Sequence, residues 1–320
     1  MNSKKLRIGF VMDPLAGIDI DKDTTFVFIE EAGARGHECF YLPPEKLSIR
    51  RGTPEAMASP VAVRRVRGDH FSPGQARTMA LEEFDVVLLR KDPPFDMEFF
   101  FDTHAASLAD TGRVLVVNDP SGLRNANEKL YSLLFPEVVP ESLVTSDMDL
   151  LREFLRELGG EMIVKPLDGC GGLGIFHVKA GDRNVNAILE ASTSQGRTRI
   201  MAQRYLPDVR RGDKRIILID GEPLGAVLRV PSDAESRSNF HVGGSAARSP
   251  LTDRDREICE RLAPRLRQDG LVFVGLDVIG DYLTEVNVTS PTGVQEINAL
   301  DGLKIEANMI DWLERHAPNG

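Results

Sequence analysis

The sequence has little cysteine, and its few cysteines are not spaced for an identifiable purpose. Among 320 residues there are three, Cys39, Cys170 and Cys259, and none of them forms a Cys-x-x-Cys motif. An odd number at such spacings does not make a disulfide framework. We therefore expect a protein of the reducing cytoplasm.

Long apolar runs are also missing. No stretch reaches the roughly 20 apolar residues that a membrane-spanning helix needs. Near the N-terminus, the apolar stretch 6–12 ends at Asp13 after seven residues, which is too short for the apolar part of a signal peptide. We expect no membrane association, and we interpret 6–12 as the first β-strand.

Positive charge is in deficit. The chain has 39 Lys+Arg against 49 Asp+Glu, a formal net charge of −10. Non-specific nucleic-acid binding is therefore not expected, and any anionic ligand needs a local cationic pocket. The six histidines show no metal-ligand spacing, and no Ser–His–Asp arrangement can be argued.

What remains is the composition of an ordinary soluble globular protein, with 28% charged and 42% apolar residues. The length suggests two or three domains. The first third alternates strand and helix signals, which predicts an α/β, doubly wound and mostly parallel sheet. The ends of such strands carry ligands, and Asp13, Arg90 and Asn118 each follow a predicted strand. The predicted strands are 6–12, 39–42, 85–89 and 114–117, the helices are 24–35 (capped by Thr24) and 96–111, and 43–60 is a predicted loop.

The rest of the chain has α+β character. A hairpin is expected across Asp220-Gly221, and the Ser-, Gly- and Asn-rich stretch 231–250 is expected to be mobile. The predicted helices are 147–158, 184–193, 252–267 and 303–316. The predicted strands are 162–166, 175–178, 200–203, 214–219, 222–230, 271–279 and 282–288.

A glycine-rich loop at 169–174, with sequence GCGGLG, matches Gly-x-Gly-x-x-Gly. The β-forming residues that follow it make the context strand–loop–strand, so the dinucleotide-binding interpretation fails, and no Gly-Lys-Ser/Thr follows to make a P-loop. Such a loop can instead lie over nucleotide phosphates, with Lys165 beside it as a phosphate ligand. The alternative is a tight turn with spare glycines.

Two carboxylates and an amide form a second pattern. Glu285 and Asn287 share one face of a strand, and with Asp277 they supply hard oxygen ligands suited to Mg²⁺. A three-residue connection Gly280-Asp281-Tyr282, or an equivalent bulge, is predicted because it places Asp277 opposite Glu285. Opposed carboxylates repel, so the pairing itself predicts a metal between them. The alternative is polar decoration of an exposed strand.

The third pattern is cationic: Lys214, Arg215, Arg229 and Arg237. Each alone is more often a solvated surface residue.

Several stretches, in this order and spacing, resemble the ATP-grasp superfamily and, within it, the prokaryotic glutathione synthetase family. They are 11–14 (VMDP), 90–96 (RKDPPFD), 127–130 (NEKL), 165–169 (KPLDG), 212–215 (GDKR), 273–277 (FVGLD) and 285–292 (EVNVTSPT). The resemblance implies an ATP-grasp fold in three parts: an N-terminal pre-ATP-grasp domain over 1–122, a lid region over 123–204 and a C-terminal domain over 205–320. It also implies a homo-oligomer, a tetramer.

The resemblance further implies roles for individual residues. Implied for ATP are Lys129, Lys165, Gly169, Gly171, Gly172, Gln203, Tyr205, Leu206 and Asp213. Implied for catalysis are Arg215, Arg229 and Arg237; for Mg²⁺ (or Mn²⁺) Asp277, Glu285 and Asn287; and for substrate Asp13, Arg90, Asp92, Ser290 and Thr292.

The implied reaction joins γ-L-glutamyl-L-cysteine to glycine through an acylphosphate formed from ATP, giving glutathione, ADP and phosphate. Positioning and charge neutralisation would suffice, with no protein nucleophile. The stretch 293–295 (GVQ) leaves amines closely related to glycine open as acceptors. Two other possibilities are a different carboxylate–amine ligase of the superfamily and a non-catalytic ATP-binding module.

Overall fold

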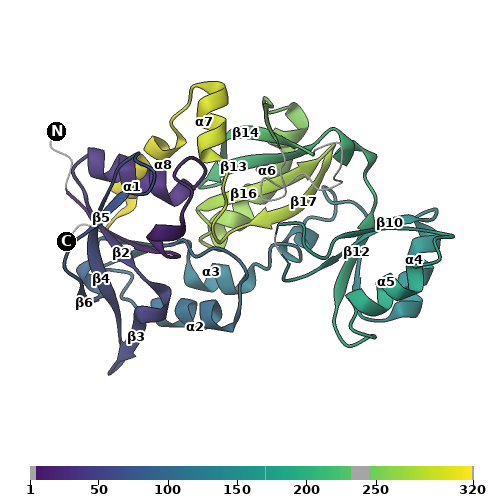
Figure 1. The fold of residues 1–320 in the computed structure, drawn as a ribbon, viewed down its shortest axis with the longest axis horizontal. Helices are drawn as coiled ribbons and strands as arrows, with labels where there is room; N and C mark the ends of the chain where they lie inside the picture. The colour runs from purple at the N-terminus through teal and green to yellow at the C-terminus, as the bar shows by residue number, and fades with distance from the viewer. Residues whose placement is uncertain (1–4, 170, 232–244, 319–320) are drawn as a thin grey trace.

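The computed structural model describes residues 5–169, 171–231 and 245–318, and three sheets carry its fold. Figure 1 shows them side by side along the long axis: the N-terminal sheet at one end, the sheet with α4 (Met148–Glu157) and α5 (Val185–Ser192) at the other, and the C-terminal sheet between them. The α/β and α+β character expected from the sequence is confirmed.

The first sheet has the strand order β3-β4-β2-β1-β7-β8, with β5 and β6 paired to β4. Strands β2, β1, β7 and β8 are parallel, as the alternating pattern predicts. The bounds are β1 (Arg7–Val11), β2 (Glu38–Leu42), β3 (Leu47–Arg50), β4 (Thr53–Val63), β5 (Phe71–Pro73), β6 (Arg77–Ala80), β7 (Val86–Leu89) and β8 (Leu115–Val117).

Helices cover both faces of this sheet, as a doubly wound fold requires. On one face, α1 (Thr24–Ala34) and the C-terminal helix α8 (Ile305–His316) pack in a common core with β1 and β7. The opposite face packs in a core shared with α2 (Met97–Ala106) and α3 (Pro120–Asn125). The first turn of α1 is capped by Asp23, whose carboxylate accepts from Phe26 N at 2.6 Å, so the prediction of Thr24 as the cap is wrong.

The prediction of a loop over 43–60 is also wrong, because β3 and most of β4 lie there. Buried Ala56 and Ala58 alternate with more exposed neighbours along β4. Small inward side chains and the prolines Pro54 and Pro60 weaken the usual signal of a strand, which rests on β-branched and aromatic residues.

The second sheet is antiparallel, in the order β11-β10-β12-β9, with α4 and α5 sharing its core. Its strands are β9 (Ser142–Thr145), β10 (Glu161–Pro166), β11 (Phe176–Lys179) and β12 (Ile200–Arg204). The glycine-rich loop joins β10 to β11, which confirms the strand–loop–strand context.

The third sheet is antiparallel, in the order β15-β14-β13-β16-β17. The hairpin turn at Asp220 and Gly221 is confirmed, and both residues have positive φ, 52° and 77°. The bounds are β13 (Asp213–Ile219), β14 (Glu222–Val230), β15 (Ser245–Arg248), β16 (Phe273–Ile279), β17 (Tyr282–Asn287), α6 (Asp253–Gln268) and α7 (Val294–Asp301). Short 3-10 helices lie at Leu15–Gly17, Pro44–Lys46, Leu81–Glu83, Tyr131–Leu134 and Pro207–Arg210.

Two further predictions need correction, and helix α7 was not predicted. Helix α2 ends at Ala106 rather than 111. The stretch 231–250, predicted as a mobile loop, contains β15 at its C-terminal end, while 232–244 lies outside the described residues.

Asn118 joins the first sheet to the third. Its amide nitrogen donates to the carbonyls of Phe273 and Val288 at 2.9 and 2.7 Å. Its amide oxygen accepts from Val272 N and Phe273 N, both at 2.8 Å. This residue at the end of β8 is therefore fully used in holding two sheets together.

Candidate active site

A cavity of about 660 Å³ is lined by residues of the second and third sheets and of the loops around them, including the loop after β7. Most of the site residues predicted from the sequence line it. They are Asp92, Lys129, Lys165, Gly169, Gly171, Gly172, Gln203, Tyr205, Leu206, Asp213, Arg215, Arg229, Asp277, Glu285, Asn287, Ser290 and Thr292. Asp13 and Arg90 do not line it, and Arg237 lies outside the described residues.

The register of β16 and β17 brings two of the predicted metal ligands together. Asp277 pairs with Glu285, as predicted. The three-residue connection is wrong, because Ile279 pairs with Tyr282 across a two-residue turn. The equivalent bulge is confirmed: the register shifts after Asp277, and the Thr284 hydroxyl donates to the Asp277 carbonyl at 3.0 Å.

Two arginines hold the Asp277 carboxylate. Arg215 binds it through two nitrogens, Nε at 2.5 Å from Oδ1 and Nη2 at 2.9 Å from Oδ2. Arg229 Nη2 lies 2.9 Å from Oδ2 and 2.5 Å from Oδ2 of Asp213. All four side chains are buried, so this network is shielded from solvent and strongly directional.

Burial and neighbouring positive charge have opposite effects on the pKa values of the carboxylates in this network. Burial alone would raise the pKa of Asp277, but Arg215 and Arg229 outweigh it and hold that pKa below its usual range. Burial raises the pKa of Asp213 to about 6, with Arg229 opposing the shift. Contrary to the prediction, the pairing of Asp277 with Glu285 does not by itself require a metal, because protein cations already lie against both carboxylates.

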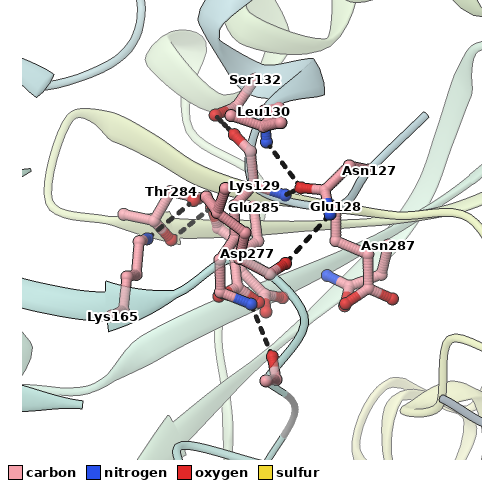
Figure 2. A network of polar contacts seen from close by, with 12 residues as sticks. Asn127, Glu128, Lys129, Leu130, Ser132, Lys165, Asp277, Thr284, Glu285 and Asn287 are labelled. Atoms are coloured by element: carbon pink, nitrogen blue, oxygen red, sulfur yellow. Dashed lines mark hydrogen bonds and ion pairs between the residues drawn. The ribbon is translucent and has the colours of Figure 1, made fainter. Parts of the chain in front are cut away.

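Lys129 connects the glycine-rich loop to β17. Its Nζ donates to the Gly169 carbonyl at 2.6 Å and lies 3.5 Å from Oε1 of Glu285. The Asn127 amide oxygen accepts from the Lys129 backbone N–H at 3.1 Å and so fixes the turn that carries this lysine. Figure 2 shows Lys129, Asp277 and Glu285 gathered between Lys165 on one side and Asn287 on the other.

Lys165 approaches the same place from β10. Its Nζ donates to Oε1 of Gln203 and to the Thr284 carbonyl, both at 3.2 Å. Burial lowers its pKa. Gln203 in turn donates to the Ser142 hydroxyl at 2.9 Å, so its amide is oriented from both ends.

Sequence reasoning missed Glu128. Its side chain lines the cavity, and its Oε1 lies 3.4 Å from the Thr289 hydroxyl oxygen that donates to it. Burial, reinforced by the negative charge of Glu285, raises the pKa of Glu128 to about 7. The residue stands in the NEKL stretch, but a glutamate beside a lysine has the pattern of a surface pair, so its sequence context gave no separate signal.

Two arginines donate hydrogen bonds to the backbone of the loop 289–292, which follows β17. Arg90 is 3% exposed and donates to the carbonyls of Thr289 (3.4 Å) and Pro291 (3.2 Å). Arg215 Nη1 donates to the Thr292 carbonyl at 3.2 Å. Burial lowers the pKa of Arg90 to about 10. The structure therefore places Arg90 beneath the cavity wall.

Asp13 and Gln295 also act from outside the cavity. The Asp13 carboxylate accepts from the Asp92 backbone N–H at 2.7 Å, which orders the loop after β7. Gln295 donates to the carbonyls of Ile20 (3.1 Å) and Asp23 (2.7 Å). It therefore ties α7 to the N-terminal unit, and it does not line the cavity.

The donor set fits a divalent cation that is shared with phosphate. Glu285 and Asn287 line the cavity from one face of β17. The Asn287 amide nitrogen donates to the Gly275 carbonyl at 3.3 Å, so the amide oxygen is the atom of this side chain that could bind a cation. Mg²⁺ is commonly held by one or two carboxylates plus phosphate oxygens and water. Within the described ranges no three His, Cys, Asp or Glu side chains form a metal-holding group by themselves.

Charge balance points the same way. Six cationic side chains line the cavity, and they face five carboxylates. The cations are Lys129, Lys165, Arg204, Arg210, Arg215 and Arg229, and the carboxylates are Asp92, Glu128, Asp213, Asp277 and Glu285. A bound triphosphate would therefore add negative charge to a nearly balanced site, and divalent cations would have to offset it.

No helix in the described part of the chain is long and apolar enough to cross a membrane. Among solved structures, the D-cycloserine synthetase DcsG aligns with a TM-score of 0.66 at 14% identity, covering 96% of this chain and 99% of that one. The ATP-grasp ligase PsnB, in a complex with the precursor peptide PsnA2 and AMPPNP, aligns with a TM-score of 0.61 at 18% identity, covering 100% and 99%. These likenesses establish the ATP-grasp fold.

Sequence comparison is more specific. A glutathione synthetase of Brucella melitensis is 49% identical over 97% of this chain and 98% of its own length, and one of Synechococcus elongatus is 47% identical over the same shares. Residues 6–124 match the family model "Prokaryotic glutathione synthetase, N-terminal domain", and residues 128–302 match "Prokaryotic glutathione synthetase, ATP-grasp domain". The chain belongs to the prokaryotic glutathione synthetase family.

Proposed function

We propose that the chain joins γ-L-glutamyl-L-cysteine to glycine with consumption of ATP, giving glutathione, ADP and phosphate. Its family makes it an ATP-dependent ligase. One observation carries the proposal: a single continuous cavity gathers the lysines beside the glycine-rich loop, the oxygen donors of β17 and the loop 289–292.

The nucleotide would lie between the second and third sheets. Gln203, Tyr205 and Leu206 would contact the base, and Asp213 also belongs to this nucleotide set. Lys129 and Lys165 would meet the phosphates under the loop of Gly169, Gly171 and Gly172. Backbone N–H groups of such a loop approach phosphate closely. Lys165 donates to two neutral oxygens, those of Gln203 and Thr284, and a phosphate would give its charge a stronger acceptor.

Glu285, Asn287 and Asp277 would hold Mg²⁺, for which Mn²⁺ could substitute. Asp277 would share its carboxylate with Arg215 and Arg229. When bound, the cation supplies charge neutralisation to the phosphates and aligns them for transfer.

The chemistry would then take two steps. A C-terminal carboxylate oxygen of the dipeptide attacks the γ-phosphorus, and the bond to ADP breaks, which leaves an acylphosphate. The neutral amine of glycine attacks the acyl carbon, loses a proton to solvent and expels phosphate, which forms the peptide bond.

Arg215 and Arg229 would neutralise the transferred phosphoryl group, together with Arg237 beyond the described residues. Arg229 is suited to this because its buried Nε has no acceptor among the described residues, and a buried donor gains from an anion placed there.

Some of the predicted substrate residues would contact the substrates directly, and others would hold the backbone that carries them. Asp92, Ser290 and Thr292 line the cavity and would contact the peptide substrates. Asp13 and Arg90 would act behind them, by holding the backbone on which these side chains are carried.

We further propose that the chain works as a homotetramer in the cytoplasm, with the three parts 1–122, 123–204 and 205–320 as its domains. Light scattering coupled to gel filtration measures the assembly. A monomer at micromolar concentration would contradict it.

Phosphate release from ATP and γ-glutamylcysteine, with and without glycine, tests the function. We expect release that depends on both the dipeptide and glycine. Release driven better by another amine would indicate a different carboxylate–amine ligase, and binding of ATP without any release would indicate a binding module.

A further inference from the structure

His177 stands in a row of side chains that crosses the second sheet. It pairs with Ile163 on β10, which pairs with Gln203 on β12. Directly paired residues of an antiparallel sheet lie on the same face, and all three of these residues line the cavity. The row begins on β11, beyond the strands that supplied the predicted nucleotide residues.

The imidazole of His177 stacks on the ring of Tyr205, which follows β12. The ring centroids are 3.9 Å apart and the planes are 17° from parallel. His177 Nε2 lies 3.3 Å from Oε2 of Glu161, on the neighbouring strand. The imidazole is thus oriented by Glu161 and presents its face to the tyrosine.

The stack on His177 is the ring–ring contact that Tyr205 makes in the described part of the chain. Tyr205 lies beyond the last residue of β12, and its ring has no other aromatic partner among the described residues. Burial, followed by the positive charge of Lys179, lowers the pKa of His177. This shift favours the neutral imidazole in the stack, and a neutral ring stacks without the cost of desolvating a charge.

We propose that His177 is a positioning residue for nucleotide binding: it holds the Tyr205 ring in the plane in which that ring packs against the base. This proposal rests on the nucleotide site proposed above and adds a residue to it. An ordered side chain does not have to be immobilised when the ligand binds. Removing the imidazole should therefore weaken base binding and leave the phosphate and peptide ends of the cavity unchanged.

Titration calorimetry with AMP tests this, because AMP carries the base and ribose but neither of the phosphates involved in transfer. We expect His177→Ala to weaken AMP binding by about three- to tenfold, from the ordering cost of one side chain. His177→Phe, which keeps a flat ring against Tyr205, should restore most of the affinity. His104→Ala, at an exposed position of α2, is the matched control and should bind AMP as the unaltered chain does.

Steady-state kinetics supply a second readout. In His177→Ala the KM for ATP should rise by a similar factor, while kcat and the KM values for glycine and the dipeptide stay within about twofold, as expected for lost uniform binding. If His177→Ala changes thermal stability but does not raise the KM for ATP selectively, the role of His177 is merely structural and the proposal is overturned.

The remaining outcomes separate the two proposals. Equal AMP affinity in His177→Ala and the unaltered chain would overturn the role of His177 alone. If AMP binds weakly to His177→Ala and equally weakly to His177→Phe, the ring stack is not the cause of the lost affinity. An unaltered chain that binds no adenine nucleotide would overturn the proposed function itself.

Discussion

Replacing Arg90 by lysine should loosen the wall of the peptide site without touching the nucleotide. The guanidinium donates to three acceptors: the Thr25 hydroxyl at 3.1 Å, the Thr289 carbonyl at 3.4 Å and the Pro291 carbonyl at 3.2 Å. It also lies 4.9 Å from the centroid of Phe273. A lysine ammonium is a single point and cannot span both carbonyls as the planar fork does.

The size of the effect follows from what is left unpaired. At least one buried carbonyl loses its donor, which costs about 1–3 kcal/mol, and part of the cation–π contact is lost as well. We therefore expect unfolding to become easier by about 2–3 kcal/mol, which lowers Tm by about 4–10 °C. Because loop 289–292 then samples other positions, the KM values for the peptide substrates should rise about tenfold.

Two assays check the Arg90→Lys prediction. Thermal unfolding gives Tm, and ADP release measured while each substrate is varied gives its KM. Arg7→Lys is the control, because Arg7 is half exposed and pairs with Glu38 at 3.5 Å, so its loss should cost less than about 0.5 kcal/mol. An Arg90→Lys chain with unaltered Tm and peptide KM values, or with a raised KM for ATP alone, would refute the reasoning.

Three further predictions concern the phosphate end and the surface. Lys165→Ala should lower turnover roughly 100-fold or more, because it removes a buried cation that would stabilise the transferred phosphoryl group. The control is Lys179→Ala, which alters an exposed lysine on β11 and should keep turnover near that of the unaltered chain. Comparable rates for the two variants would remove Lys165 from the site. Glu285→Gln should raise the half-saturating Mg²⁺ concentration about 10–100-fold, and electron paramagnetic resonance of bound Mn²⁺ should show the same loss; unaltered metal affinity would contradict a ligand role. Burial raises the pKa of Asp102 from 3.8 to about 6, so the native state loses stability as pH rises through that interval. Asp102→Asn should therefore raise stability at about pH 8 by no more than about 1 kcal/mol after solvent screening of this half-buried group and change little below about pH 4; a Tm difference independent of pH would count against the burial.

Local chemistry made much of the site predictable. The pairing of Asp277 with Glu285 followed from requiring both side chains on one face, and the bulge at Thr284 satisfies that requirement. The glycine-rich loop between two strands was recognisable because the residues after it are β-formers. These inferences hold because strand periodicity and turn chemistry are local.

What escaped prediction depends on tertiary contacts. The position of Arg90 after a strand predicts a ligand contact. Nothing near it in the sequence shows that its guanidinium instead donates to backbone carbonyls about 200 positions later. His177 stacks on Tyr205, which follows the separate strand β12. The two arginines on Asp277 likewise come from β13 and β14, so the neutralisation of that carboxylate by protein cations could not be read from the spacing of the carboxylates alone.

The account rests on transfer of the γ-phosphoryl group to the dipeptide carboxylate in this cavity. The most direct test labels that carboxylate with the heavy oxygen isotope and analyses the released phosphate by mass spectrometry after turnover with ATP, Mg²⁺ and glycine. The account predicts one labelled oxygen atom in each phosphate and one glutathione formed with it, because the bond made to phosphorus is kept when the amine displaces phosphate. Unlabelled phosphate released in step with glutathione would contradict the acylphosphate and with it the proposed work of Lys165, Arg229 and Glu285.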